Sequence, residues 1–398
     1  MDPAPVTQDE LREFASSLWA AFHEDMSDAD AGRWERVLEA ERTLAIRDRG
    51  RIVAGTGIFS RRLAVPGGVV PAAAVTLVGV RPSHRRRGLM SSLMRRQLND
   101  VHEGGREAVT VLWASEPVIY GRFGYGLGTQ AADLRVASGS ARLRSVPDAR
   151  VDLLTPTEAL PAIRELHEAL WPTIPGMLDR EDRWWEDRTE DPEEHREGNT
   201  PLRAAVTDGA YALYAVKRQW DENGPDSEVV VLEALAATPE GEAAIWNYLI
   251  GLDLTRRISW DLAPSDHPLM HMVANAQHVK MTLGYGLWVR LVDVPRALAE
   301  RAYGEPFEVV LEVEDDVLPW NAGRWALRWD GTTASCAATA TPAALALSST
   351  ELGAAYLGGT RLETLARAGR VRELRPGALA AASRAFAGER APWCPEIF

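Results

Sequence analysis

The stretch "VGVRPSHRRRGLMSSLM", residues 78–94, decides the fold class of this chain. Val78 and Val80 alternate as in a strand, and Pro82 ends such a strand because its nitrogen has no hydrogen to donate. After Gly88, apolar residues recur at helical spacing as far as Val101. The order strand, turn, helix therefore predicts that three consecutive arginines lie at the N-terminus of a helix.

The arginines and Gly88 together predict an anion site. The first amides of a helix lack partners within it, and the helix dipole favours a negative charge there. Gly88 lets the backbone approach the anion, and the guanidinium groups of Arg85 and Arg86 supply forked donors for phosphate oxygens. We interpret the turn as a pyrophosphate site; the alternatives are nucleic-acid binding, a sorting signal and a structural surface cluster.

Composition limits the classes of partner and setting. The 398 residues carry 44 basic and 57 acidic side chains, a net charge of −13 that favours cationic partners over nucleic acid. Two cysteines, Cys336 and Cys394, are too few for a disulfide framework or a zinc site, which favours a reducing cytoplasmic setting, and Cys394 is expected to be a buried thiol. The start has no signal-peptide pattern and no apolar run reaches membrane-spanning length, so no membrane contact is expected.

His267 and His271 are separated by Pro268 and no carboxylate completes a metal-binding motif, so no metal is predicted.

Three blocks follow one another along the chain. Residues 1–147 have the pattern of an α/β unit, in which Thr7 and Glu10 have the spacing of a capping box and Pro66 begins a turn between strands. Residues 148–290 contain a second apolar strand, a break at Thr238 and a helix, with Glu240 and Glu242 where the arginines would be. We interpret this block as a second copy of the first unit that has lost its anion site.

Residues 291–398 change to period-two strands and short helices, as in "GRWALRWDG", which predicts an α+β unit. No low-complexity tract or long linker separates the blocks, so they are expected to pack as one particle. The charged run 179–200, which begins "DREDRWWEDR", is interpreted as a solvated helix and loop.

The spacing of residues in the stretch 78–94 indicates which phosphorylated ligand the anion site would bind. V-x-V-x-P-x-x-R-R-x-G, as found from Val78 to Gly88, resembles the signature of the GNAT superfamily of acetyl-CoA-dependent N-acetyltransferases. The superfamily core R-x-x-G-x-G/A is met at Arg85 and Gly88 and departs at Met90, where a small residue is usual. The resemblance and the turn together give these expected acetyl-CoA contacts: Val78, Gly79, Val80, Arg85, Arg86, Arg87, Gly88, Leu89, Met90 and Ser115.

The stretch "SEPVIYGRFGYG", residues 115–126, resembles a second motif of that superfamily. Tyr120 stands where a tyrosine on a short helix precedes a glycine–aromatic pair. A phenol with a reference pKa of about 10 is protonated at neutral pH and can donate to a departing thiolate. Tyr120 is thus the expected acid; the alternatives are that it only packs, or that Tyr125 is the donor.

Nearly the whole chain resembles the Eis (enhanced intracellular survival) family of acetyltransferases. The resemblance rests on "VRPSHRRRG", "ASEPVIYGRFGYG", the second block, "WNAGRWALRWDG" and the ending "APWCPEIF". It implies α/β and α+β units arranged as two tandem GNAT-like domains and a sterol-carrier-protein-like domain, assembled as a homo-hexamer. It also implies that the terminal carboxylate, here that of Phe398, acts as a base, whereas the alternative for any chain end is a frayed segment.

The family resemblance also suggests the acceptor. Aminoglycosides, acetylated at one or several amines and so linked to antibiotic resistance, are the substrates that it implies, and a polycationic acceptor fits an acidic cleft. The acids expected to line the cleft are Glu24, Asp25, Asp28 and Glu396. The alternatives are a protein, peptide or small-amine acceptor, or a non-catalytic module that binds acyl-CoA.

Overall fold

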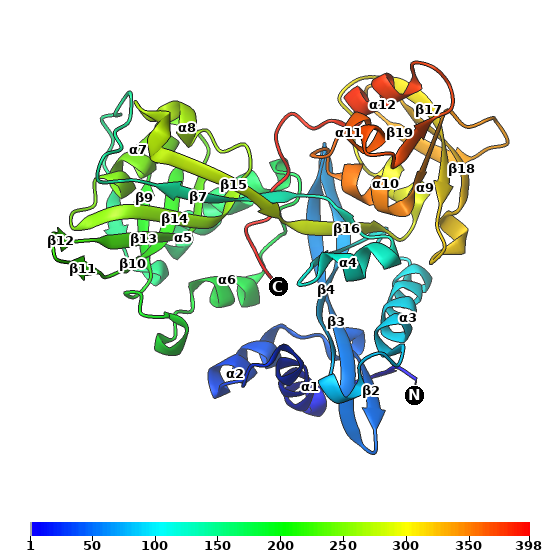
Figure 1. Cartoon of the computed structure of the whole chain (residues 1–398), viewed down its shortest axis with the longest axis horizontal. Helices are drawn as coiled ribbons and strands as arrows, with labels where there is room; N and C mark the ends of the chain where they lie inside the picture. Colours follow the sequence, from blue (N-terminus) through cyan, green and yellow to red (C-terminus); the bar gives the residue numbers. More distant parts are fainter. Residues whose placement is uncertain (1) are drawn as a thin grey trace.

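Three β-sheets organise the molecule, and the computed structural model describes them through residues 2–398, apart from the side chain of Phe22. Two sheets have seven strands each, one has five, and a two-stranded hairpin, β11 (Trp220–Asp221) with β12 (Gly224–Pro225), projects from the second. Figure 1 shows the second sheet on the left, the third at the upper right and the first running down the centre. No helix in this described part of the chain has the length and apolar character that crossing a bilayer requires.

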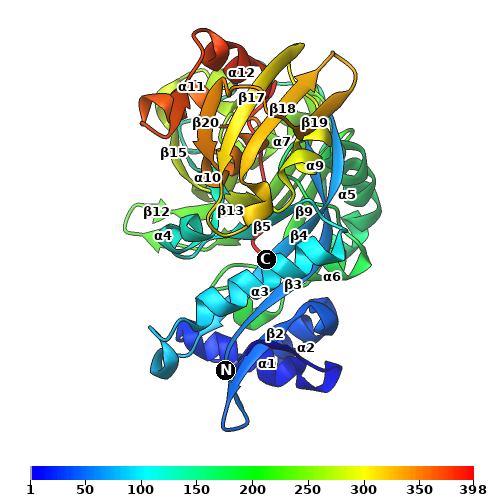
Figure 2. The same cartoon turned by 90° about the vertical axis from the view of Figure 1, so that its right-hand side faces the viewer.

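The first sheet begins where the sequence predicted strands. In spatial order its strands are β1 (Ala4–Pro5), β2 (Leu44–Asp48), β3 (Arg51–Val65), β4 (Gly68–Val80), β5 (Val109–Trp113), β16 (Leu287–Leu291) and β6 (Gly126–Leu127). Its helices are α1 (Leu11–Trp19), α2 (Asp28–Val37), α3 (Leu89–Gly104) and α4 (Pro117–Tyr120). The capping box of Thr7 and Glu10 is present and leads into α1 through a 3-10 turn. Figure 2 shows α3 lying along β3 and β4.

The second sheet repeats this plan, as expected for a second copy. Its order is β15 (Val279–Tyr285), β7 (Gln130–Val136), β14 (Thr255–Pro264), β13 (Ser227–Ala236), β10 (Ala210–Lys217), β9 (Arg203–Thr207) and β8 (Asp152–Leu154). The accompanying helices are α5 (Pro156–Leu170), α6 (Asp182–Thr189), α7 (Pro239–Ile250) and α8 (Leu269–Met272). The predicted strand, break and helix correspond to β13, Thr238 and α7.

The third unit is α+β, in agreement with its period-two pattern. Its strands are β19 (Ala334–Ala338), β18 (Gly323–Trp329), β17 (Phe307–Glu314), β20 (Leu345–Ser348) and β21 (Val371–Glu373). Its helices are α9 (Val294–Ala299), α10 (Ser349–Tyr356), α11 (Leu362–Arg367) and α12 (Ala378–Phe386). The fold class predicted from sequence is thus confirmed.

The first two sheets exchange strands. β7 follows β6 along the chain but pairs in the second sheet, and β16 follows β15 but pairs in the first. The connections cross where the amide of Leu287 donates to Thr129 Oγ1 at 2.8 Å, and a Cβ on Gly286 would lie 2.3 Å from that oxygen. Only glycine fits such an approach. Strand pairing therefore crosses both of the domain boundaries expected from sequence, 147/148 and 290/291. These boundaries remain predictions.

The third unit packs against the strand that the first sheet receives. Gly353 of α10 lies so close to β16 that a Cβ there would be 2.2 Å from the carbonyl oxygen of Val289. Beside this contact, Arg290 of β16 donates to both carboxylate oxygens of Asp315 at 2.8 and 2.6 Å. One apolar core continues from the first sheet through β16 into α10 and β17. The units thus pack as one particle, as expected.

Candidate active site

A gap opens between the parallel strands β4 and β5. Their paired residues end with Val75 opposite Leu112, and β5 stops at Trp113 whereas β4 continues to Val80. On β4, Leu77 and Val78 oppose the single residue Thr56 of β3, and Leu77 has a φ of +48°. Such a bulge bends the strand. Past Val75, the edge of β4 that faced β5 is therefore open to an extended ligand that carries amide groups.

A buried glutamine supports the bulge from the helix side. Gln97 of α3 is 1% exposed, and its amide nitrogen lies 3.0 Å from Thr56 Oγ1 and 3.3 Å from the carbonyl oxygen of Gly57. These bonds tie α3 to the stretch of β3 that faces the bulge. The helix and the open edge of β4 therefore hold a fixed geometry relative to each other.

The arginine turn lies at the end of this open edge. β4 ends at Val80, a 3-10 turn spans 82–84, and α3 begins at Leu89 with Gly88 as its N-cap, as the sequence predicted. Arg86 and Gly88 both have positive φ, and no side chain caps the helix amides. Arg85, Arg86 and Arg87 are exposed. The turn presents uncapped amides and three cationic side chains to solvent.

The other expected donor-site residues surround the gap. Val78 and Leu89 are buried, and Gly79 lies under α1, where a Cβ would be 3.2 Å from Leu18. Val80 and Met90 are half-buried against apolar clusters under α3, so the larger side chain at Met90 is accommodated by packing. Ser115 lies exposed in the loop after β5.

Tyr120 lies on the α3 face of the sheet at this gap. It is 4% exposed and packs in the cluster that contains Ile58, Val75 and Leu112, which form one row across β3, β4 and β5. Burial, with a smaller effect of Glu116, raises the pKa of Tyr120 to about 12, so the phenol keeps its proton. Within residues 2–398 its hydroxyl has no hydrogen-bond partner. The phenol thus keeps its proton and makes no hydrogen bond within the described residues.

Tyr125, the other candidate acid, has a packing role. It is fully buried, and its hydroxyl accepts a hydrogen bond from Thr110 Oγ1 at 2.8 Å. Burial raises its pKa well above the ordinary value. Its ring centroid lies 6.1 Å from that of Tyr120, and both rings pack in the same apolar cluster on the α3 face.

The C-terminus lies on the opposite face of the same strands. The ring centroid of Phe398 is 6.5 Å from that of Phe59 on β3, with the planes at 72°. Phe59 is in one row with Ala74 and Val111, next to the row that Tyr120 contacts, and successive residues of a strand point to opposite faces. Figures 1 and 2 both show the chain end beside β3 and β4. Tyr120 and Phe398 therefore flank the start of the gap from its two sides.

The chain end is ordered by burial. Trp393 and Cys394 are each 1% exposed, in agreement with the apolar character of "APWCPEIF". Burial, followed by the nearby Glu396 carboxylate, raises the pKa of Cys394 to about 12. The thiol is buried and protonated, as expected, and the end of the chain is packed rather than frayed.

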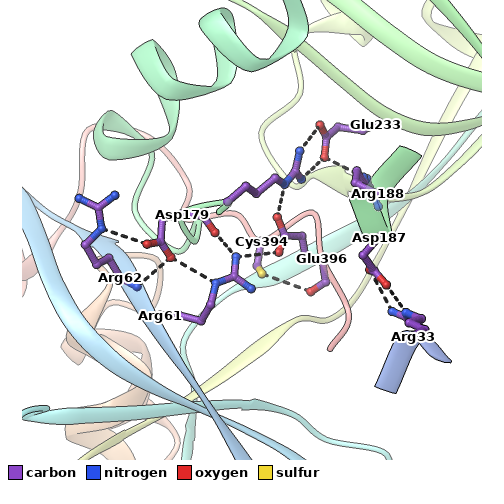
Figure 3. A network of polar contacts seen from close by, with 10 residues as sticks. Arg33, Arg61, Arg62, Asp179, Asp187, Arg188, Glu233, Cys394 and Glu396 are labelled. Carbon is purple, nitrogen blue, oxygen red and sulfur yellow. Dashed lines mark hydrogen bonds and ion pairs between the residues drawn. The ribbon is translucent and has the colours of Figure 1, made fainter. Parts of the chain in front are cut away.

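A cavity of about 230 Å³ adjoins Phe398. Its lining comprises Arg33, Arg180, Trp184, Asp187, Arg188, Glu190, Leu232, Glu396, Ile397 and Phe398. Asp187 accepts a bond from Arg33 at 3.1 Å, drawn in Figure 3, and Glu190 lies 2.5 Å from Arg36. The cavity lining thus combines carboxylates and arginines with apolar side chains.

Of the four acids that the sequence predicted to line an acceptor cleft, only one lines the cavity beside Phe398. Glu24, Asp25 and Asp28 are exposed on the loop and first turn that follow α1, outside this lining, and Asp28 pairs with Arg12. Glu396 lines the cavity but is occupied by ion pairs.

The interpretation of 179–200 as a solvated helix and loop was wrong for its first half. Trp184 and Trp185 of α6 are 5% and 1% exposed, and Asp187 and Glu190 reach the cavity. The sequence did not predict these two acids, because they stand in a run of charges that is typical of a solvated segment. The two adjacent tryptophans were the available signal, since residues of that size are usually buried.

Glu396 binds two buried arginines. Its carboxylate lies 3.1 Å from Arg61 Nη2 and also bonds Arg180 Nε, and both arginine side chains are 1% exposed. Arg180 in turn binds Glu233, with Nη1 2.9 Å from Oε1, and Arg61 binds Asp179 at 3.2 Å. Figure 3 shows Glu396 at the centre of this network. Burial raises the pKa of Glu396, but Arg180 and Arg61 outweigh burial and lower it to about 2.

This low pKa predicts a pH dependence of stability. A carboxylate whose pKa falls from 4.5 to about 2 on folding stabilises the native state above pH 4.5 and loses that contribution as pH falls toward 2. The contribution is about 3 kcal/mol. We expect the urea midpoint of the native sequence to fall more steeply than that of Glu396→Gln over this window. Parallel curves would contradict the ion-pair assignment.

His267 serves packing and hydrogen bonding. Its Nε2 lies 3.0 Å from Glu242 Oε1, and its Nδ1 accepts from the amide of Leu269. Both ring nitrogens are thus engaged. Among residues 2–398, no three histidine, cysteine or acidic side chains gather as a metal site would require.

Comparison with known families identifies the class. Two models described as acetyltransferase (GNAT) domains match residues 2–128 and 176–291, and a model described as a sterol carrier protein domain matches residues 294–395. An uncharacterized N-acetyltransferase of Streptomyces avermitilis is 41% identical over 408 residues, covering 100% of this chain and 99% of the relative. Fold, gap and matches together define an N-acetyltransferase of the GNAT superfamily, a class of enzymes that use acetyl-CoA.

Two further relatives identify the family. The N-acetyltransferase Eis of Mycobacterium bovis is 33% identical over 386 residues, covering 93% of this chain and 92% of that protein. The crystal structure of Eis1 from Mycobacterium abscessus matches with a TM-score of 0.88 and 30% identity, covering 100% of both chains. This chain belongs to the Eis family of N-acetyltransferases.

Proposed function

We propose that this enzyme transfers an acetyl group from acetyl-CoA to amines of a cationic, aminoglycoside-like acceptor by direct attack, at one or more positions. One observation carries the proposal: Tyr120 and the chain end at Phe398 flank the same gap of the first sheet from opposite faces. A thioester in this gap would have an acid on its sulfur side and a carboxylate on its acceptor side. Two tasks of acyl transfer would thus be divided between the faces of one sheet.

Acetyl-CoA fits the residues along β4 and the turn. Arg85, Arg86 and the amides after Gly88 would hold its pyrophosphate, because that turn combines a helix dipole with exposed guanidinium groups. The open edge of β4 around Val78 and Val80 would pair with the amides of the pantetheine arm. The donor supplies the activated acetyl carbon.

The proposed step balances as follows. The neutral amine nitrogen attacks the thioester carbonyl carbon, and the carboxylate of Phe398 accepts the proton that nitrogen loses, directly or through water. The carbon–sulfur bond breaks, and the departing sulfur receives a proton from the hydroxyl of Tyr120. The products are an amide and free coenzyme A.

A cationic acceptor is supported by charge. The chain has a net charge of −13, and the cavity beside Phe398 includes the carboxylates of Asp187 and Glu190. Both carboxylates are paired with arginines of α2, and an acceptor with several ammonium groups would compete with those arginines for them. The exposed Glu24, Asp25 and Asp28 are proposed as outer contacts.

We predict that Tyr120→Phe lowers kcat by about 10²-fold with little change in the thermal midpoint, because proton donation is lost but no hydrogen bond is. The matched control is Tyr125→Phe, which loses the bond from Thr110 and should cost about 1 kcal/mol of stability while kcat stays near the native value. Steady-state kinetics and thermal unfolding check both variants. Full turnover by Tyr120→Phe would remove the proposed acid.

We predict that replacing Arg85 and Arg86 together by alanine raises KM for acetyl-CoA about tenfold or more, since charged hydrogen bonds to phosphate contribute about 1.5–3 kcal/mol. At saturating acetyl-CoA, kcat should stay near the native value because neither side chain reaches the reacting atoms. The control is Arg95→Ala, an exposed arginine within α3 itself, beyond its first turn. An unchanged KM would argue against the phosphate assignment.

The direct test of function is release of free thiol from acetyl-CoA across a panel of amines. The panel comprises aminoglycosides, polyamines, lysine peptides and small arylamines. Preference for aminoglycosides, with a mass gain of one or more acetyl groups, supports the proposal, whereas preference for lysine peptides or small amines favours the other acceptors. If the protein binds acetyl-CoA but releases free thiol with none of these amines, it is a non-catalytic module.

We also propose, from membership of the family, a cytoplasmic homo-hexamer. Light scattering coupled to size exclusion should give six chain masses. A monomer mass at micromolar concentration would contradict this assembly.

A further inference from the structure

The second sheet contains the same strand divergence as the first. β13 and β14 are parallel and pair as far as Val230 opposite Ser259, although β13 continues to Ala236 and β14 to Pro264. Opposite β10, β13 carries an extra residue, Leu232, two positions after the last pair, as Leu77 stands two positions after Val75 in β4. The second unit therefore has a gap with the geometry of a donor site.

The helix start beside this second gap is closed to anions. Thr238 caps α7 by accepting a hydrogen bond from the amide of Gly241 at 3.1 Å. In the first turn, Glu242 adds a negative charge and is held by Trp246 Nε1 at 2.7 Å and His267 at 3.0 Å. A capped, negatively charged helix start disfavours phosphate. The second gap thus has no counterpart of the arginine turn.

Protein groups bind both edges of the second gap. On β14, the carbonyl oxygen of Leu262 accepts the indole N–H of Trp393 at 2.6 Å, and that ring packs edge-on against Trp260 with centroids 5.9 Å apart. On β13, the carbonyl oxygen of Leu232 accepts from Arg188 Nη2 at 3.1 Å. Each contact lies beyond the last paired residues. One carbonyl group on each edge is therefore bonded by this chain, on β14 by its own end, while a cavity of about 420 Å³ lined by Val230–Leu232, Trp260–Leu262 and Ile397 remains between the strands.

A series of ion pairs links the second gap to the first sheet through the C-terminal tail, residues 393–398. Glu233, next after Leu232 on β13, binds Arg180; Arg180 binds Glu396; and Glu396 binds Arg61 of β3. Both arginines and Glu233 are 1% exposed and Glu396 is 11% exposed, so solvent competes little for these contacts (Figure 3). Glu396 precedes Phe398 by two residues. The tail is thus fixed immediately before its terminal carboxylate.

We infer that the second GNAT-like unit serves as a socket for the C-terminal tail, and that Glu396 is a positioning residue which sets the carboxylate of Phe398 at the first gap. The inference rests on the proposed role of that carboxylate as base. The strand gap proposed to receive the acyl donor in the first unit is bonded in the second by Trp393 and bordered by Ile397. The second unit therefore acts on the reaction through the tail.

The test is a double-mutant cycle. Glu396→Ala is made in the full chain and in a chain that ends at Ile397 and so lacks Phe398. In the full chain the variant should lower kcat about 10- to 100-fold, as a displaced catalytic group does, with KM for acetyl-CoA unchanged. In the truncated chain it should cause less than about a twofold further loss, because the group that it positions is already absent. Glu305→Ala, which breaks an exposed ion pair with Arg384, is the control.

The outcomes separate the two proposals. Equal fold losses in both backgrounds would mean that Glu396 acts on folding alone, and would overturn the socket. Full turnover by Glu396→Ala beside a collapse on removal of Phe398 would overturn the positioning role but leave the terminal base intact. Full turnover without Phe398 would instead overturn the base, and the socket with it. If Glu396→Ala does not fold, Glu396→Gln, which keeps the volume, is compared in the same two backgrounds.

Discussion

Appending one glycine after Phe398 is expected to lower kcat by about 10²-fold or more. The extension converts the carboxylate of Phe398 into an amide and moves the new carboxylate by one residue, while the tail up to Cys394 stays buried. An amide cannot accept the proton of the attacking amine. Because the arginine turn is unchanged, KM for acetyl-CoA should stay within about twofold of the native value.

A matched control is a glycine inserted elsewhere, in the exposed turn at Asp330–Gly331 of the third unit. That insertion should leave kcat near the native value. Thermal unfolding of both variants separates loss of the base from loss of the fold. If the extended chain turns over at the native rate, the base is another group and the terminal carboxylate has no catalytic role.

Arg290→Ala is expected to destabilise the native state by about 3–5 kcal/mol, the cost of leaving a buried charge without its partner. The Arg290 and Asp315 side chains are 0% and 1% exposed, and burial lowers the pKa of Arg290 despite Asp315. Asp315 also accepts hydrogen bonds from the amides of Val317 and Leu318, so it stays held in the interior when the arginine is removed. The pair joins β16 to the third unit, and the loss should therefore loosen that interface.

Urea unfolding followed by tryptophan fluorescence measures this loss. Replacing Arg290 and Asp315 together should cost clearly less than the sum of the two single changes, since no unpaired charge is left. Arg384→Ala removes an exposed ion pair, with side chains 56% and 42% exposed, and should change stability by less than about 1 kcal/mol. A loss below 1 kcal/mol for Arg290→Ala would mean that the pair does not hold the units together.

Local features of the fold could be predicted from sequence because each depends on neighbouring residues. The capping box at Thr7, the end of β4 before Pro82 and the start of α3 after Gly88 are set by hydrogen bonding within a few residues. The exchange of β7 and β16 could not be predicted in this way. Strand partners far apart in sequence are chosen by the packed sheets, and the crossing at Gly286 has no local signature.

The same distinction between local motifs and distant partners applies to the residues of the candidate site. Tyr120 and the arginines lie in contiguous motifs, and the interest in Phe398 came from the resemblance of the ending "APWCPEIF" to the family. The fate of Glu396 was not predictable, because its partners Arg61 and Arg180 are 335 and 216 residues away and become neighbours only in the folded chain. An acidic residue beside a chain end gives no local sign that it will be buried between arginines.

The most direct test of the central claim is a crystal structure of the enzyme with coenzyme A and an aminoglycoside. The account predicts the sulfur within about 3.5 Å of Tyr120 Oη on the α3 face, and an acceptor amine within hydrogen-bond reach, about 3 Å, of the Phe398 carboxylate on the other face, directly or through one water. Pyrophosphate would lie on the turn at Arg85–Gly88. Coenzyme A bound between β13 and β14, or an amine that approaches the sulfur from the Tyr120 face, would contradict it.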